Sequence, residues 1–133
     1  MRRLVRAFSS PLAALAAIAL PAAALPAVAQ AHPKLLSSTP AAEATVARPT
    51  QIRLTFSEAL VGPLSGIELV MTAMPGMADH APMPITGFKT LVQGTDILVN
   101  LPRPLPAGSY ALKWHAVAAD QHRIQGDYTF TVR

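Results

Sequence analysis

Apolar and polar residues alternate with a period of two along much of the chain from residue 32 onward. The clearest examples are residues 52–57, 110–115 and 128–132, where each apolar side chain is followed by a polar or small one. Successive side chains of a β-strand point to opposite faces, so this spacing predicts strands with one face in the core and one in water. Weaker patterns of the same kind predict further strands at residues 35–38, 66–72, 86–92 and 96–101.

Turn-forming residues separate these segments. Gly94 and Thr95 predict a hairpin turn between the segments 86–92 and 96–101, and Pro-Ala-Gly at 106–108 predicts a turn into the strand at Tyr110. No segment shows the 3.6-residue apolar period of a helix. About seven short strands in this length of chain predict one all-β domain, an antiparallel Greek-key β-barrel or β-sandwich.

The first 31 residues have the layout of a secretory signal peptide. Three arginines within the first six residues precede an uncharged apolar run from residue 12 to 29, and Ala29-Gln30-Ala31 has the small-x-small pattern that signal peptidase recognises. The alternative is a retained membrane anchor, but two prolines interrupt the run, which is shorter than the roughly 20 apolar residues of a span. We therefore expect cleavage of residues 1–31, a mature domain over 32–133 without a membrane span, and export by the general secretory or the twin-arginine route.

The positive charge of the chain belongs mainly to this leader. The chain has 11 Lys and Arg against 7 Asp and Glu, but three of the cations precede residue 32, which leaves eight against seven in the mature domain. A nearly neutral domain lacks the basic surface that nucleic acid attracts, so we exclude nucleic acid as a partner. The chain contains no cysteine, which excludes disulfides, thiol chemistry and cysteine metal sites.

Cleavage after residue 31 would make His32 the first residue of the mature protein. Its terminal α-amine and its imidazole could then chelate one metal ion. Pro33 has no backbone N–H for copper to displace, so further ligands must come from elsewhere in the fold. The alternative is that His32 only happens to follow the cleavage site, since some residue must.

Asp120 and His122 are the candidates for these further ligands. Residues two apart on an extended segment point to the same side, so their carboxylate oxygen and imidazole nitrogen could converge. With His32 they would supply three nitrogens and one oxygen, which suits Cu(II), with Zn(II) as a competitor. The alternative is an ordinary polar turn. Glu58 either orients a ligand from nearby or is a solvated strand end.

A methionine-rich segment is a separate candidate site. Met71, Met74, Met77, His80 and Met83 follow one another at intervals of three residues, and no other methionine occurs after residue 31. Methionines at this spacing normally form the buried face of a helix, but three prolines and a glycine between residues 75 and 84 exclude a continuous helix. We interpret the segment as a loop with no core to fill. Its thioethers and imidazole suit Cu(I) or Ag(I), and the alternative is a hydrophobic docking loop for a partner.

Together these features resemble the periplasmic copper-resistance proteins of the CopC/PcoC type. Besides His32 as first residue, the resemblance rests on the segments S-S-T-P at 37–40, I-R-L-T-F-S-E at 52–58, L-P-A-G-S-Y-A-L-K-W at 105–114 and A-A-D-Q-H at 118–122. It implies a cupredoxin-like, immunoglobulin-like fold. It also implies a Cu(II) site at His32, Asp120 and His122 with Glu58 nearby, and a Cu(I) site in the methionine loop.

The chain departs from the family pattern at two positions. The family usually has glycine where this chain has Gln121, which affects the turn between Asp120 and His122 and so the Cu(II) geometry. His80 follows Met77 at a looser spacing than the resemblance leads us to expect, so the identity of the sulfurs that join it stays open.

The resemblance implies a copper carrier or buffer in copper resistance or homeostasis that performs no reaction of its own. It implies partners among inner-membrane copper permeases and multicopper oxidases. Two other classes stay open. A copper monooxygenase with an N-terminal histidine would need a broad aromatic face, whereas residues 32–133 contain only six aromatic residues. A metal-free docking module of the cell envelope would use the methionine loop as its contact surface.

Overall fold

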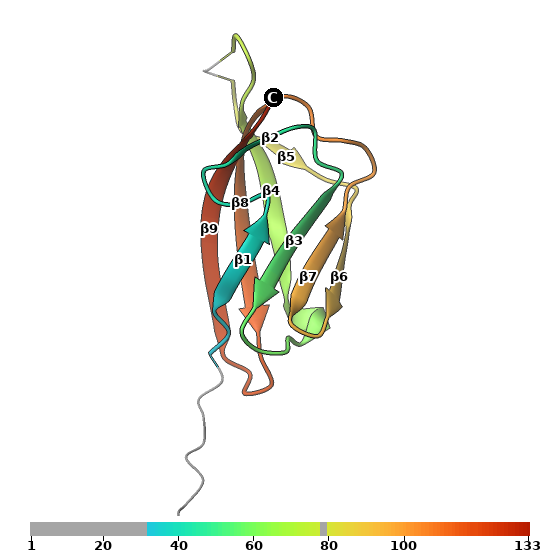
Figure 1. Ribbon diagram of the computed structural model, residues 1–133, viewed down its shortest axis with the longest axis vertical. Coiled ribbons are helices and arrows are strands. Elements are labelled where there is room, and N and C mark those ends of the chain that lie inside the picture. The colour runs from blue at the N-terminus through green and yellow to red at the C-terminus, as the bar shows by residue number, and fades with distance from the viewer. Residues whose placement is uncertain (1–31, 78–79) are drawn as a thin grey trace, which may run out of the picture.

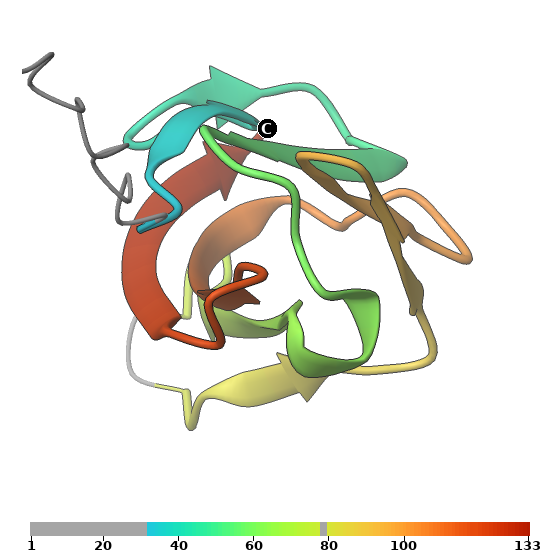
Figure 2. The same ribbon diagram turned by 90° about the horizontal axis from the view of Figure 1, so that it is seen from below.

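The computed structural model describes residues 32–77 and 80–133. The predicted signal peptide, residues 1–31, lies outside the described residues. In the described part, two β-sheets face each other and enclose the core, as Figures 1 and 2 show from the side and from below. No helix in this part of the chain is long and apolar enough to cross a membrane.

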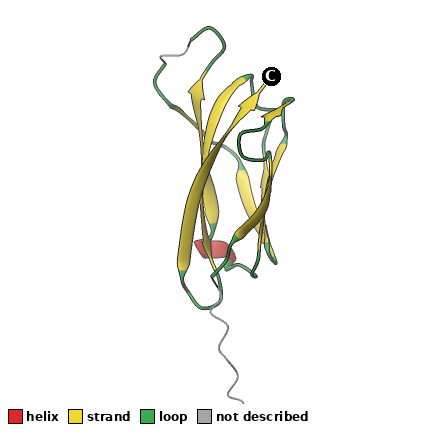
Figure 3. Ribbon diagram, turned by 60° about the vertical axis from the view of Figure 1, so that its left-hand side comes forward, coloured by secondary structure: helices red, strands yellow, loops and turns green. Residues whose placement is uncertain are grey.

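One sheet has four strands in the order β1-β3-β7-β6, and the other has five in the order β2-β9-β8-β4-β5. The only helical element among the described residues is a short 3-10 helix, η1, between β3 and β4 (Figure 3). The bounds are β1 (Leu35–Thr39), β2 (Thr45–Val46), β3 (Gln51–Phe56), η1 (Gly62–Leu64), β4 (Gly66–Ala73), β5 (Met83–Ile85), β6 (Lys89–Gln93), β7 (Asp96–Asn100), β8 (Gly108–Val117) and β9 (Arg123–Val132).

The core lies between the sheets and follows the predicted alternation. In β3, Ile52, Leu54 and Phe56 are buried, while Arg53 is exposed. Burial of these apolar faces is the main favourable term in folding, since it removes apolar surface from water. Other buried side chains are Ile97 and Val99 from β7, Leu112 and Trp114 from β8, and Tyr128, Phe130 and Val132 from β9.

The structure confirms the all-β sandwich, with differences in detail. No strand pairing among the described residues closes the sheets into a barrel, and the short β2 pairs with β9 in parallel. The strand predicted at 86–92 is present as β6, but it begins at residue 89, because the chain leaves β5 in one sheet and enters β6 in the other between residues 85 and 89. Gly87 lies in this connection with a φ of 80°, a conformation that glycine adopts without steric cost and that ends a strand.

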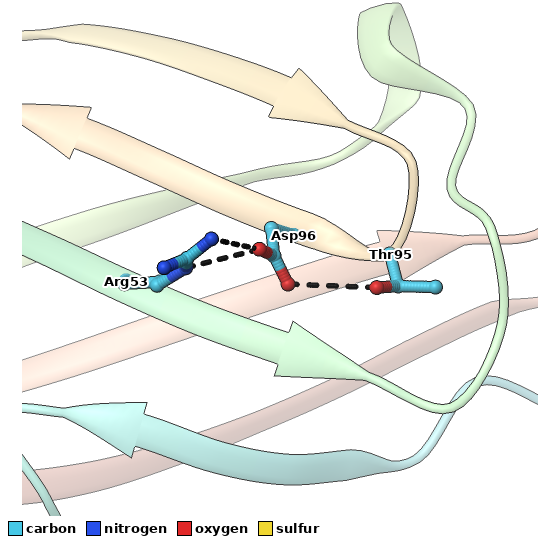
Figure 4. A network of polar contacts seen from close by, with 3 residues as sticks. All are labelled: Arg53, Thr95 and Asp96. Carbon is cyan, nitrogen blue, oxygen red and sulfur yellow. Dashed lines mark hydrogen bonds and ion pairs between the residues drawn. The ribbon is translucent and has the colours of Figure 1, made fainter.

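An exposed ion pair joins β3 and β7 near the turn that leads from β6 to β7. Figure 4 shows Asp96 Oδ2 accepting hydrogen bonds from Arg53 Nε at 3.0 Å and Nη2 at 2.6 Å. A hydrogen bond from Thr55, and next the contact with Arg53, hold the pKa of Asp96 below its ordinary value. The pair is diagonal in the β3–β7 ladder, where Arg53 lies opposite Leu98 and Asp96 opposite Thr55, and exposed ion pairs of this kind contribute little to stability.

Tyr110 anchors the beginning of β8. Its side chain is fully buried and its ring stacks on that of Phe130, with 5.3 Å between the ring centroids. Its hydroxyl donates a hydrogen bond of 2.7 Å to the carbonyl oxygen of Pro106, four residues upstream. This contact resembles the tyrosine corner of immunoglobulin-like domains. Burial raises the pKa of Tyr110 from 10.0 to about 12.

We expect Tyr110→Phe to lower the free energy of unfolding by about 1 kcal/mol, because the tyrosine loses a partly buried hydrogen bond to the Pro106 carbonyl. In the wild type the unfolded chain releases the Tyr110 proton at lower pH than the folded chain does. Stability should therefore fall as pH rises from about 10 to about 12. The phenylalanine variant should show a smaller fall, with the remainder from Tyr128, whose pKa burial also raises. Urea titrations across this pH range measure both effects, and an unchanged alkaline fall would contradict the assignment.

Candidate metal centre

His32 lies at the end of the sandwich where β1 begins and β3 ends. The next residue, Pro33, has a fully buried side chain, and Lys34 forms two hydrogen bonds with Ser57, the first residue after β3. The His32 side chain is exposed. The segment that leads to His32 is thus attached to the fold, although the imidazole itself faces solvent.

Asp120 and His122 lie in the hairpin between β8 and β9. Their convergence was predicted from an extended segment, but a turn produces it instead: Gln121 has a φ of 65°, and the His122 N–H donates to Asp120 Oδ1 at 3.1 Å. The second carboxylate oxygen, Oδ2, lies 2.8 Å from His122 Nδ1. A positive φ is costly for residues other than glycine. This explains physically why glycine suits the position that Gln121 occupies.

The three predicted Cu(II) ligands meet in space. One ligand atom from each of His32, Asp120 and His122 lies within 4.8 Å of the other two, and the imidazole centroids of the two histidines are 5.1 Å apart. The hydrogen bond from His122, helped by the nearby His32, holds the pKa of the Asp120 carboxyl below its ordinary value. The group therefore presents an ionised carboxylate and two imidazoles at one exposed point.

Glu58 does not join this group. It is exposed in the loop that follows β3 and supplies no atom to the three-residue cluster. Its predicted role as an orienting carboxylate stays a prediction. In the uncleaved chain the nitrogen of His32 belongs to a peptide bond, so its donation to a metal depends on the predicted cleavage.

The methionine segment is a loop only in its middle. Met71 belongs to β4 and Met83 to β5, where the two residues are partners across the strand pair. Met71 is 2% exposed and packs in the core, whereas Met83 is 47% exposed. The interpretation that no methionine of the segment fills the core is therefore wrong for Met71. Strict alternation along β4 turns its side chain inward.

A tight turn brings Met74 and Met77 together. Their backbones pair with each other through a hydrogen bond of 3.0 Å from the Met77 N–H to the Met74 carbonyl oxygen. Pro75 and Gly76 form the two central residues, and the φ of 75° at Gly76 is the conformation that a type II turn requires there. Met74 is half-buried against the core, and Met77 is 58% exposed. The turn therefore presents thioethers at the end of β4.

One ring nitrogen of His80 forms a hydrogen bond, and the other has no hydrogen-bond partner among the described residues. Its Nδ1 lies 2.6 Å from the carbonyl oxygen of Ala81. A carbonyl oxygen only accepts, so Nδ1 carries the proton and Nε2 keeps its lone pair in the neutral ring. Nε2 is buried without a hydrogen-bond partner among the described residues. A buried acceptor without a partner is costly, and a metal ion would satisfy it.

The two candidate sites lie at opposite ends of the sandwich. The β8–β9 hairpin and the start of β1 lie at the bottom of Figure 1, and β4 leads to the methionine turn at the top. The register agrees, since Ala73 at the end of β4 pairs with Ser109 at the start of β8, far from the hairpin that follows Val117. One ion therefore cannot contact both sets of ligands.

The burial of Met71 generates a stability test. We expect Met71→Ala to lower the free energy of unfolding by about 2 to 5 kcal/mol, because it leaves a cavity in the core. The exposed Met77→Ala should change it by less than about 0.5 kcal/mol. Met71→Leu, which preserves volume, should cost less than about 1.5 kcal/mol. Chemical denaturation measures all three, and equal effects of the two alanine substitutions would refute the core assignment.

Comparison with known proteins identifies a family and two similar relatives from different bacteria. The CopC domain family matches residues 35–133. Copper resistance protein C of Escherichia coli is 49% identical over 106 residues, which cover 79% of this chain and 84% of that protein. Copper resistance protein C of Pseudomonas syringae pv. tomato is 49% identical over 111 residues, which cover 80% and 85%.

A solved structure agrees with these matches. The crystal structure of PcoC, a methionine-rich copper resistance protein from Escherichia coli, superposes with a TM-score of 0.69 and 44% sequence identity. The superposition covers 77% of this chain and 100% of PcoC. The CopC match over residues 35–133 spans the sandwich, Asp120, His122 and the methionine segment, and it begins after His32.

Proposed function

The chain belongs to the CopC domain family, and we propose that it is an exported, periplasmic copper-binding protein with a separate site for each oxidation state of copper. Cu(II) binds at His32, Asp120 and His122, and Cu(I) binds at the methionine turn with His80. The protein serves as a copper carrier or buffer in copper resistance. Its relatives are named for copper resistance and not for a reaction, which agrees with a binding protein that is not an enzyme.

The Cu(II) proposal is carried by the convergence, within 4.8 Å, of three ligand atoms from segments far apart in the sequence. Nitrogen and carboxylate donors suit Cu(II). Cleavage before His32 would add the α-amine and complete a set of three nitrogens and one oxygen. The hydrogen bond between Asp120 and His122 holds both side chains toward the position of the ion before it binds.

The Cu(I) proposal is supported by donor chemistry and by the available His80 Nε2. Met74 and Met77 approach through their turn, and Met83 offers an exposed third sulfur on β5. Thioethers are soft donors that match Cu(I), and they need not lose a proton to bind it. Met71 was predicted among these ligands as well, but its burial assigns it to the core.

Separate ends for the two ions fit a carrier that can transfer copper in either oxidation state. Inner-membrane copper permeases and multicopper oxidases would be its partners in such a transfer. A metal-free docking module predicts that the purified protein carries no copper. A monooxygenase predicts oxygen-dependent cleavage of a polysaccharide.

The Cu(II) site should depend on the position of the N-terminus. A protein that begins at Ala31 has a peptide nitrogen at His32 in place of an amine, so we expect its Cu(II) affinity to be at least about tenfold lower than that of the protein that begins at His32. Competition titration against a chelator of known affinity measures the difference. Cu(I) affinity serves as the control and should not change, and equal Cu(II) affinities would show that His32 is not the anchor.

The Cu(I) site should depend on three sulfurs. Leucine in place of Met74, Met77 and Met83 keeps the side-chain volume but removes the donors, so Cu(I) and Ag(I) affinity should fall by more than about a hundredfold. The free energy of unfolding should change by less than about 1.5 kcal/mol, and Cu(II) affinity should stay the same. Met71→Leu is the matched control and should bind Cu(I) as the wild type does. Retained Cu(I) binding in the triple variant would favour the docking loop.

A further inference from the structure

The two halves of the candidate Cu(II) site are attached to different sheets. His32 precedes β1 in the four-stranded sheet, and Asp120 and His122 lie between β8 and β9 of the five-stranded sheet. A chelate needs its donors at fixed separations. Some element must therefore hold the two halves in place relative to each other, and the loop between β3 and β4, residues 57–65, contacts both.

Ser57 holds the half that carries His32. The Lys34 N–H donates to Ser57 Oγ at 2.9 Å, and the Ser57 N–H donates to the Lys34 carbonyl oxygen at 2.9 Å. Leu35 pairs with Phe56, and the ladder between β1 and β3 is irregular between Leu35 and Ser37. The two bonds, with the buried ring of Pro33, fix the chain directly before this irregular point and so help to set the direction in which His32 leaves the fold.

Ser65 holds the half that carries Asp120 and His122. It is the buried polar residue of the described core, and its Oγ accepts a hydrogen bond of 3.0 Å from the Val117 N–H and donates one of 3.0 Å to the Val61 carbonyl oxygen. The Val61 N–H in turn donates to the Val117 carbonyl oxygen at 2.7 Å. Both backbone polar groups of the last residue of β8 are thus engaged by this loop.

The same loop continues the attachment up to the hairpin. Leu60 and Ala118 form an isolated β-bridge, and the Gln121 N–H donates to the Ala118 carbonyl oxygen at 2.9 Å. The loop therefore holds the chain at Val117 and Ala118, and the bond from Gln121 closes the turn that carries Asp120.

We propose that the loop of residues 57–65 fixes the relative position of the two halves of the copper site. Ser57 and Ser65 are positioning residues, which set the separation of His32 from Asp120 and His122 without touching the ion. This proposal rests on the proposed Cu(II) site. The proposal gives both hydroxyls the same role. The exposed hydroxyl of Ser57 and the buried hydroxyl of Ser65 each place metal ligands that are themselves exposed.

The test uses Ser57→Ala, Ser57→Thr and Ser37→Ala in the protein that begins at His32. Ser57 is exposed, so its alanine variant should keep the wild-type melting temperature within about 3 °C. We expect its Cu(II) affinity to fall about five- to tenfold, the equivalent of one lost hydrogen bond. The threonine variant keeps the hydroxyl and should restore the affinity. Ser37→Ala, an exposed change on β1, should bind Cu(II) as the wild type does.

Two readouts separate positioning from a general loss of structure. Cu(I) affinity at the far end should be unchanged in Ser57→Ala. Proton NMR of the metal-free protein should show a close contact between the His32 and His122 rings in the wild type and a weaker one in Ser57→Ala, together with faster exchange of the Lys34 amide. Wild-type Cu(II) affinity and an unchanged ring contact in Ser57→Ala would overturn the role of Ser57.

Ser65→Ala tests the second half of the proposal. Its melting temperature should fall because the Val117 N–H loses a buried partner. Its Cu(II) affinity should also fall about fivefold or more, with Cu(I) affinity unchanged. Wild-type Cu(II) affinity in this variant would overturn the role of Ser65. If the wild type itself binds no Cu(II), the proposed function fails, while the metal-free ring contact and the Lys34 exchange still decide whether residues 57–65 position His32.

Discussion

The contact between Phe56 and Trp114 joins the two sheets at the end where the candidate Cu(II) ligands meet. Their ring centroids are 5.1 Å apart in an edge-to-face arrangement, an orientation that aromatic pairs favour. Phe56 is the last residue of β3 and Trp114 lies near the end of β8. Gly126 makes room for the indole, because a Cβ there would lie 2.5 Å from Trp114 Cζ2. The separation of the sheets depends on this packing. The distance between His32 and the β8–β9 hairpin depends on it as well.

The two ends of the sandwich present different types of donor atom. At the end that carries the candidate Cu(II) ligands, a turn, a buried proline and backbone hydrogen bonds hold an ionised carboxylate and two imidazoles. Hard and borderline donors therefore face solvent at set positions. At the other end, the donors lie on a tight turn and on the short strand β5, and the thioethers are uncharged. Uncharged thioethers carry little electrostatic cost, which permits these candidate Cu(I) ligands to lie beside the apolar core.

The methionine segment shows how one sequence spacing can serve two purposes. Residues at intervals of three meet on one side of a helix, but here the chain changes from strand to turn to strand between Met71 and Met83. Met71 faces the core because β4 continues through it, and Met77 faces solvent because the turn at Pro75 and Gly76 has ended that strand. The backbone conformation, and not the spacing, separates a core side chain from a candidate ligand.

The sequence by itself determined the sandwich and the types of donor. Period-two alternation at 52–57, 110–115 and 128–132 specifies the buried faces, because a shift of one residue would turn every apolar side chain to water. Residue chemistry alone selected His32, Asp120, His122 and the methionines. Only the tertiary structure decided that His32 reaches the hairpin and that the chain changes sheets near Gly87. These outcomes depend on contacts between segments far apart in sequence and on local φ values, and neither is encoded in the periodicity of a single segment.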